Sequence, residues 1–264
     1  MKIIYIIYND WTKRQRSELL KAGFNVEDGF DRVEIEENER NRSILNLIDK
    51  WKLDRSSYGT LFEKSDFKDK ELFAYEGNWN NGYPQPEGDF GYLNITYDLS
   101  DYCKDCGIGK VQIAPFQIKR APSLEKKKLF DLFWVNDEIF TSRDVYEGLF
   151  KKLGIEAWPV IHFKTGKILA NTVQLKITQV DVPVNTDGID FETCPVCNRK
   201  KYTPKTKGFP PNFRSTPPHL PLFKGMEDYG AGGDAHKRIY LTKDLYEEFN
   251  QFSIKPYLWP VQPI

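Results

Sequence analysis

The sequence predicts an α+β protein in which an N-terminal α/β region precedes a larger, strand-rich region made of two related halves. Three observations lead to this prediction. The composition, with 14% aromatic residues and 16 prolines among 264 residues, favours strands over a helical bundle. The four cysteines form two Cys-x-x-Cys pairs, far apart in the chain. A nine-residue segment also recurs with conservative changes.

The charge balance argues against general binding to polyanions. The chain has 38 basic and 38 acidic residues and a pI near 6.8, so nothing attracts nucleic acid or an anionic membrane to the whole molecule. The apolar run at residues 3–8 is short and is more typical of a buried strand than of a secretion signal. No run reaches the roughly 18 to 20 apolar residues of a membrane helix. We therefore expect a cytoplasmic protein with reduced thiols and no membrane partner.

The N-terminal α/β region is expected to span residues 1–91. After the first strand, apolar residues recur at helical spacing over 11–24, where Gly23 marks the expected end, and again over 38–53. The turn-rich segment 76–91 closes the region. Four acidic residues between the first strand and the second helix are a candidate contact surface for a partner. They are Glu34, Glu36, Glu37 and Glu39.

The two cysteine pairs are expected at the tips of hairpins. Apolar residues alternate over 93–99 before the first pair and at Val111 and Ile113 after it, a pattern typical of paired strands. The pattern around the second pair is looser, and we expect a second hairpin-like turn there. Gly107 and Asn198 directly follow the last cysteine of each pair, and both residue types tolerate the positive φ that a zinc knuckle requires.

Together the two pairs predict one zinc site. Tetrahedral zinc takes four ligands, and each Cys-x-x-Cys turn supplies two thiolates. The predicted ligands are Cys103, Cys106, Cys194 and Cys197. Because four thiolates leave no open position for water, we expect one structural zinc ion per chain and not a catalytic one.

An internal repeat organises the second region, residues 92–264. "IFTSRDVYE" at 139–147 matches "IYLTKDLYE" at 239–247, and only one of the nine positions differs in character. Each copy predicts a strand and a helix with Ser142 or Thr242 as N-cap, followed by Trp-Pro-Val. Each copy also follows one cysteine pair. We infer two βα halves, about 103–160 and 194–261, related by a pseudo-twofold axis and joined by the shared zinc.

Residues 203–233 are expected to form a long loop and not a sheet, since they include six prolines and five glycines. Compact domains seldom keep such loops without a use, so this segment is the second candidate contact surface. Its proposed contact residues are Phe213, Arg214 and His219.

We expect no enzymatic activity. The chain has no Ser-His-Asp or Cys-His set, no HExxH motif and no phosphate loop, and the adjacent Asp137 and Glu138 resemble ordinary surface charge. A zinc-ribbon protein that binds nucleic acid or has a regulatory role is the alternative, because basic residues surround Tyr202 after the second cysteine pair. These residues are Arg199, Lys200, Lys201, Lys205 and Lys207.

The order of these features resembles the double-CXXCG-motif family of bacterial polymorphic-toxin immunity proteins. The resemblance covers about residues 93–250 and rests on "CKDCG", "DEIFTSRDVYE", "VQLKI" and "TCPVC", together with Gln112, Pro115 and Phe116. Asn198 departs from the glycine of the family motif, and the residues before Gly91 do not align. The resemblance implies a cytoplasmic protein that binds and neutralises a cognate protein toxin.

Overall fold

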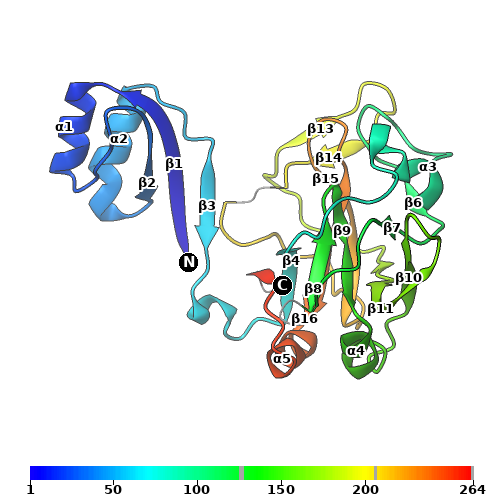
Figure 1. Ribbon diagram of the computed structural model, residues 1–264. Helices are drawn as coiled ribbons and strands as arrows, with labels where there is room; N and C mark the ends of the chain where they lie inside the picture. Colours follow the sequence, from blue (N-terminus) through cyan, green and yellow to red (C-terminus); the bar gives the residue numbers. More distant parts are fainter. Residues whose placement is uncertain (125–127, 205–206, 263–264) are drawn as a thin grey trace. The chain divides into compact units, whose positions relative to one another are not determined.

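A computed structural model describes residues 1–124, 128–204 and 207–262 (Figure 1). It is a mixed α+β fold, mostly strands with five short α-helices in the described ranges, as the sequence predicted. The chain forms two compact units, the first made of residues 1–69 with 207–210 and the second of the remaining described residues. The described residues contain no helix long and apolar enough to span a bilayer.

The first unit is a three-stranded antiparallel sheet with two helices. The strand order is β2-β1-β3. Its elements are β1 (Lys2–Trp11), α1 (Lys13–Lys21), β2 (Gly29–Glu36), the 3-10 turn η1 (Glu39–Asn41), α2 (Arg42–Lys50), β3 (Tyr58–Leu61) and the 3-10 turn η2 (Lys64–Phe67). Alternate residues of β1 are buried, as expected for a strand with one covered face.

Both helices of the first unit form where their apolar spacing predicted them. Thr12 caps α1, because its side chain accepts from the backbone N–H of Gln15 and the Gln15 side chain accepts from Thr12 in return. Leu19 of α1 and Ile44 of α2 share one core with Ile7 of β1. The hydrophobic face of each helix thus packs on the sheet.

The second unit has two main sheets and a small ribbon. The larger sheet has the order β13-β14-β15-β16-β4-β17, with β12 beside β15. Its strands are β4 (Leu72–Gly77), β12 (Thr178–Gln179), β13 (Phe191–Thr193), β14 (Lys200–Tyr202), β15 (Leu222–Tyr229), β16 (His236–Thr242) and β17 (Tyr257–Pro260). The smaller sheet has the order β7-β10-β11-β9-β8. Its strands are β7 (Gln117–Ile118), β8 (Leu129–Leu132), β9 (Val135–Ser142), β10 (Ala157–His162) and β11 (Ile168–Leu175).

The other elements of this unit are short. The ribbon pairs β5 with β6. The bounds are η3 (Gly88–Phe90), α3 (Tyr92–Thr96), β5 (Tyr97–Asp98), β6 (Val111–Gln112), α4 (Arg143–Val145), the π-helical turn η4 (Tyr146–Phe150) and α5 (Lys243–Gln251). Ser142 caps α4 through a hydrogen bond from the backbone N–H of Val145, whereas the predicted cap Thr242 makes no such bond to α5.

The two repeat segments occupy equivalent places in the two sheets. The order β8-β9-β11-β10 in one sheet corresponds to β15-β16-β4-β17 in the other. Thr141 of β9 pairs with Leu129 and Val173, and its counterpart Leu241 of β16 pairs with Leu222 and Phe73. The prolines of the two Trp-Pro-Val segments also have equivalent partners, since Pro159 pairs with Val173 and Pro260 pairs with Phe73. Strand order and register therefore agree across the two halves.

The boundary between the units falls at 69/70, whereas the sequence suggested 91. The reason is β4, which lies between β16 and β17 and occupies the place that β11 holds in the other half. A strand from before the first half thus completes the second half. Residues 70–77 are consequently part of the second unit.

Two further predictions need correction. Residues 93–99 were expected to be a strand, but 92–96 form α3, in which Tyr92 and Thr96 are buried on one helical face, and only Tyr97–Asp98 is extended. Residues 203–233 were expected to lack a strand, but Leu222–Tyr229 is β15. The prolines of this segment end at Pro221, and the apolar residues that follow can pair with β16.

Candidate metal centre

The two Cys-x-x-Cys pairs lie in turns that are built in the same way. The first pair lies between β5 and β6, and the second lies between β13 and β14. In the first turn, the N–H of Cys103 donates to Ile108 O at 2.9 Å, and the N–H of Gly107 donates to Cys103 O at 2.8 Å. The second turn repeats both bonds, from Cys194 to Arg199 O at 3.0 Å and from Asn198 to Cys194 O at 2.9 Å.

Gly107 and Asn198 have the backbone conformation that the sequence predicted. Their φ angles are 80° and 59°. Gly107 has a second requirement, because a Cβ there would lie 2.4 Å from the backbone oxygen of Gly233. Asparagine therefore suffices in the second turn, while the first turn needs glycine for both backbone angle and space.

The fold brings the four predicted ligands together. Cys103 Sγ lies 3.7 Å from Cys194 Sγ, Cys106 Sγ lies 3.6 Å from Cys197 Sγ, and all four sulfurs are within 4.8 Å of one another. Four sulfurs at 2.3 Å from one zinc ion in a tetrahedron are about 3.8 Å apart. The sulfurs are too far apart for disulfides and are spaced to hold one metal ion, and the residues fit zinc.

Arg199, which follows the second turn, makes a hydrogen bond to one of the four sulfurs. Arg199 Nε donates to Cys197 Sγ at 3.3 Å, and its two terminal nitrogens bind the side chain and the backbone oxygen of Asp101 at 2.8 and 2.7 Å. Asp101 precedes the first turn, so one guanidinium group ties the two cysteine turns together. Such outer contacts orient metal ligands and stabilise charge on the sulfur.

A buried lysine forms a second hydrogen-bonded link between the two cysteine turns. Lys201 of β14 is only 3% exposed. Its ammonium group donates to Cys106 O and Asp234 O, each at 3.0 Å, and also to Gly232 O. Three carbonyl oxygens thus satisfy the three N–H groups of the buried charge.

Two of the four thiols, those of Cys106 and Cys197, differ in acidity when no metal is bound. The hydrogen bond from Arg199 lowers the pKa of Cys197 to about 6, whereas burial raises the pKa of Cys106 to about 12. Cys103, Cys106 and Cys194 are buried, and Cys197 is partly exposed. Of the four thiols, that of Cys197 is thus the most accessible to a metal ion in solution.

We predict that Arg199→Ala lowers metal affinity about 10- to 100-fold, because it removes the N–H···S bond and the link to Asp101. Competition with a chromophoric chelator measures the change. Arg214→Ala is the matched control, since Arg214 is likewise paired with an aspartate, Asp187, away from the sulfurs. An equal loss in the two variants would contradict the role of Arg199.

The predicted contact residues belong to both units of the chain. Glu34 and Glu36 alternate with buried residues on β2, so both lie on its outer face. Glu37 is paired with Lys207 at 2.7 Å, and Glu39 with Arg42. These four residues belong to the first unit.

The contact residues predicted in 203–233 differ in exposure. Arg214 and His219 are exposed. Phe213 is 2% exposed and packs against Phe223 and Tyr240 with ring centroids 5.8 and 4.8 Å away. Phe213 is therefore part of the core and not of a contact surface, because the aromatic residues of β15 and β16 enclose it.

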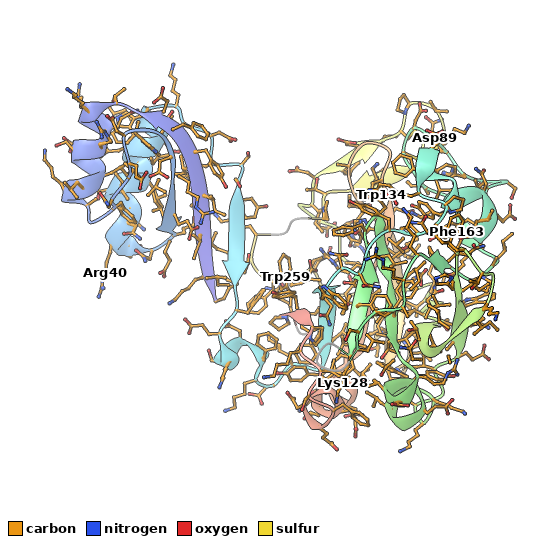
Figure 2. The ribbon with its side chains drawn as sticks, viewed as in Figure 1. Arg40, Asp89, Lys128, Trp134, Phe163 and Trp259 are labelled. Carbon is orange, nitrogen blue, oxygen red and sulfur yellow. The ribbon has the colours of Figure 1, made fainter. Side chains whose placement is uncertain are left out.

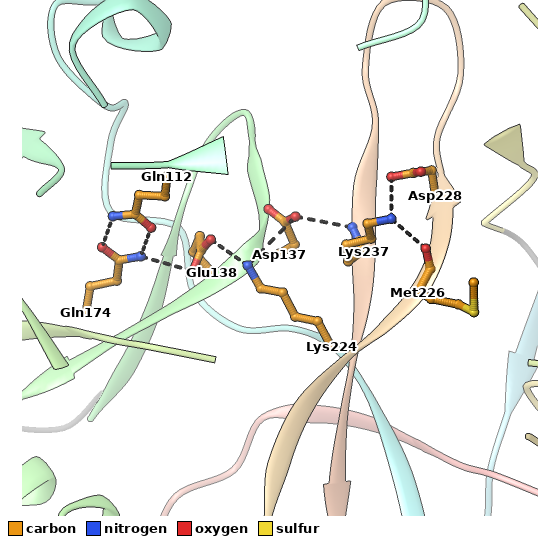
Figure 3. Close-up of polar contacts among 8 residues, drawn as sticks. All are labelled: Gln112, Asp137, Glu138, Gln174, Lys224, Met226, Asp228 and Lys237. Atoms are coloured by element: carbon orange, nitrogen blue, oxygen red, sulfur yellow. Dashed lines mark hydrogen bonds and ion pairs between the residues drawn. The ribbon is translucent and has the colours of Figure 1, made fainter. Parts of the chain in front are cut away.

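The sequence interpretation missed a buried charged network on the strands of the repeat (Figure 3). Asp137 and Glu138 of β9, expected as surface charge, are 8% and 6% exposed. Lys224 Nζ of β15 lies 2.6 Å from Glu138 Oε1 and 4.0 Å from Asp137 Oδ2, so it links the two sheets. In the sequence these two carboxylates stand directly before the strand predicted from Ile139, and nothing in that position distinguishes them from surface charge.

Comparison with known proteins adds no family assignment. No protein-family model matches the chain, and no curated protein matches it significantly. Fold and site define a strand-rich α+β protein with a four-cysteine cluster that can hold one metal ion.

Proposed function

We propose that this protein is an immunity protein that binds and neutralises a cognate bacterial protein toxin and carries one structural zinc ion. The motif order described above supports the immunity assignment. A cluster of exposed aromatic residues in the second unit supports protein binding, and this observation carries the proposal.

The cluster, called here the aromatic surface, consists of Tyr83, Phe90, Phe133 and Trp134. The Tyr83 ring lies 4.8 Å from Phe133 and 4.4 Å from Trp134, and Phe90 lies 4.7 Å from Trp134, all between centroids. Phe90, Phe133 and Trp134 remain 51%, 42% and 36% exposed. Contiguous exposed aromatic side chains are typical of protein-binding surfaces.

The backbone holds this surface in an uncommon conformation. Asp89, Phe90 and Trp134 have φ angles of 49°, 52° and 68°, a region that non-glycine residues seldom adopt. Figure 2 labels Asp89 and Trp134 near one another in the second unit. Such conformations cost about 1 to 3 kcal/mol each and are enriched at functional sites. Three such residues occur at or beside the exposed aromatic rings, which favours a binding role for those rings.

The nucleic-acid alternative has less support, because its basic residues are already engaged. Arg199 binds Asp101, and Lys201 is buried against carbonyl oxygens. Lys207 pairs with Glu37 in the first unit, and Lys200 Nζ lies 4.4 Å from the Phe191 ring centroid. The fifth residue, Lys205, lies outside the described residues. Three of the four described basic residues are thus bound to acidic groups or carbonyl oxygens, which makes them less available to phosphates.

A structural role for zinc follows from the ligand set. Four thiolates complete a tetrahedron, so a zinc ion bound by them has no open position for a substrate or water. The ion would join a turn from each half of the second unit. We accordingly propose a protein that acts by binding and not by catalysis.

Trp134→Ala tests this function. The protein encoded beside this gene serves as the partner, in a growth-protection assay and in a direct binding measurement. Wild-type protein is expected to protect cells and bind, and Trp134→Ala is expected to bind at least about 30-fold more weakly, as for a central aromatic contact. Tyr257→Ala, at a residue 74% exposed elsewhere on the unit, is the control. Failure of the wild type to protect cells would overturn the proposed immunity function. Unchanged binding by the Trp134→Ala variant would overturn the proposal that the aromatic surface binds the partner.

A further inference from the structure

A cavity of about 800 Å³ lies beside the buried charged network of the second unit. Residues from both sheets line it, including Asp137 and Glu138 from β9 and Lys224 from β15. Its size is in the range of small-molecule sites, which are about 300 to 1,000 Å³. The polar groups facing this cavity show what it can bind.

Glu138 needs nothing further from a ligand. Its Oε1 accepts from Lys224 Nζ at 2.6 Å, and its Oε2 accepts from Gln174 Nε2 at 3.0 Å. Gln174 in turn exchanges two hydrogen bonds with Gln112, at 2.7 and 2.9 Å. Glu138 is thus neutralised by one ammonium group and held in place by an amide pair (Figure 3).

Asp137 is incompletely paired, although it is 8% exposed. Its Oδ2 accepts from the backbone N–H of Lys237 at 3.2 Å and lies 4.0 Å from Lys224 Nζ. Its Oδ1 has no hydrogen-bond donor among the described residues. Burial raises the pKa of Asp137, but the ammonium groups of Lys224 and Lys110 outweigh burial and hold the pKa below its usual value. A buried carboxylate that stays ionised calls for a further donor.

The neighbouring ammonium groups do not fill this role. Lys224 is bonded to Glu138, and Lys237 Nζ binds Asp228 Oδ1 at 2.9 Å and Met226 O at 2.5 Å. Asp137 and Glu138 thus share Lys224 as their ion-pair partner, while Lys110 and His236 act on Asp137 only through their charge and do not bond to it. Asp137 Oδ1 is therefore left without a donor from the described residues on the cavity wall.

The cavity walls also suit a positive group. Tyr97 and Trp158 line it, and each ring already has an ammonium group of the protein near it. Lys110 Nζ lies 5.8 Å from the Tyr97 centroid, and Lys176 Nζ lies 4.6 Å from that of Trp158. Aromatic faces attract cations through their ring quadrupole. The two aromatic walls therefore already accommodate a positive group each.

We propose that this cavity is a binding site for an organic cation, an alkylammonium or guanidinium group whose N–H groups donate to Asp137 Oδ1. The cation supplies the charge that Lys224 cannot, and its apolar part lies along the aromatic walls. A bare metal ion does not fit these features, because the four cysteines are the one group of three or more metal-ligating residues found in the described ranges. This site is independent of the proposed binding of a toxin at the aromatic surface.

The test compares a cation with its neutral isostere. Zinc-loaded, full-length protein is titrated at low ionic strength with n-butylguanidinium and with n-butylurea in a calorimeter. We expect saturable binding of the guanidinium, and binding at least about tenfold weaker for the urea and for the Asp137→Asn variant, which keeps the size of the side chain but removes its charge. Glu156→Gln is the matched control, since Glu156 also lines the cavity but is already paired with Lys176.

The source of the cation is distinguished by two further probes. Agmatine represents a free small molecule, and an N-acetylated, C-amidated Gly-Arg-Gly peptide represents a side chain of another protein. Tighter binding of either probe, if it is lost in Asp137→Asn, supports the site and identifies the source. Equal binding of the guanidinium and the urea, or equal binding to the wild type and Asp137→Asn, overturns the proposal. Thermal unfolding and zinc content of each variant exclude misfolding as the cause.

Discussion

Replacing Cys103 or Cys194 with serine is expected to release the metal ion and to unfold the second unit. Structural zinc bound by four thiolates stabilises small domains by about 10 kcal/mol. Domains are commonly stable by only 5–15 kcal/mol in total, so a loss of this size removes most or all of the stability. Either substitution is expected to have this effect, because each cysteine pair supplies half of one shared ligand set.

Elemental analysis and calorimetry measure these two consequences. We expect about one zinc ion per wild-type chain and none in either variant, together with loss of the unfolding transition of the second unit. The first unit is an internal control, because none of the four cysteines lies in it. Chelation of zinc from the wild type should reproduce the result. One zinc ion retained in both variants would rule out a shared site.

Replacing Lys224 with methionine is expected to destabilise the second unit by about 3 to 5 kcal/mol. The side chain of Lys224 is 12% exposed, and those of Asp137 and Glu138 are 11% and 7% exposed. Burial alone would lower the pKa of Lys224, but the two carboxylates outweigh burial and raise it, so the ammonium group stays charged. Removing it leaves two buried carboxylates without their counter-ion, which is the costly way to break a buried pair.

Urea denaturation at constant zinc concentration measures this loss. The variant Lys224→Met with Asp137→Asn and Glu138→Gln should recover most of the stability, because no uncompensated charge then stays buried. Lys151→Met is the matched control, since Lys151 pairs with Glu147 on the surface and is expected to contribute at most about 1 kcal/mol. A loss in Lys224→Met no larger than in this control would show that the buried carboxylates do not depend on Lys224.

The metal ligands could be predicted because their signal is local. Two cysteines three positions apart, followed by a residue that tolerates positive φ, specify a turn whose geometry depends on few residues. The same holds for the two helices of the first unit, which apolar spacing and the residues near their ends indicated. The strand assignment of 93–99 failed because the residues that face the core are Tyr92 and Thr96, four positions apart as on a helix, whereas Ile95 of the alternating set is 40% exposed.

The buried network and the cavity could not be predicted from the sequence. Asp137 and Glu138 are ordinary in sequence, and burial became evident only when β15 and β16 brought Lys224 and Lys237 against them. The aromatic surface is similar, since Tyr83 and Phe90 come from one segment and Trp134 from another that is more than forty residues away. Contacts between distant segments depend on chain topology, which local patterns do not encode.

By itself the sequence determined the α+β class, the four cysteines of the candidate metal centre and the matched strand and helix segments of the repeat, because each depends on local spacing. Only the tertiary structure decided that β4 completes the second half, as β11 completes the first. It also decided which charges are buried and which aromatic rings remain exposed. The physical reason is that burial depends on how the layers pack. Packing brings together residues that are far apart in the chain, and local sequence patterns do not predict which of them will meet.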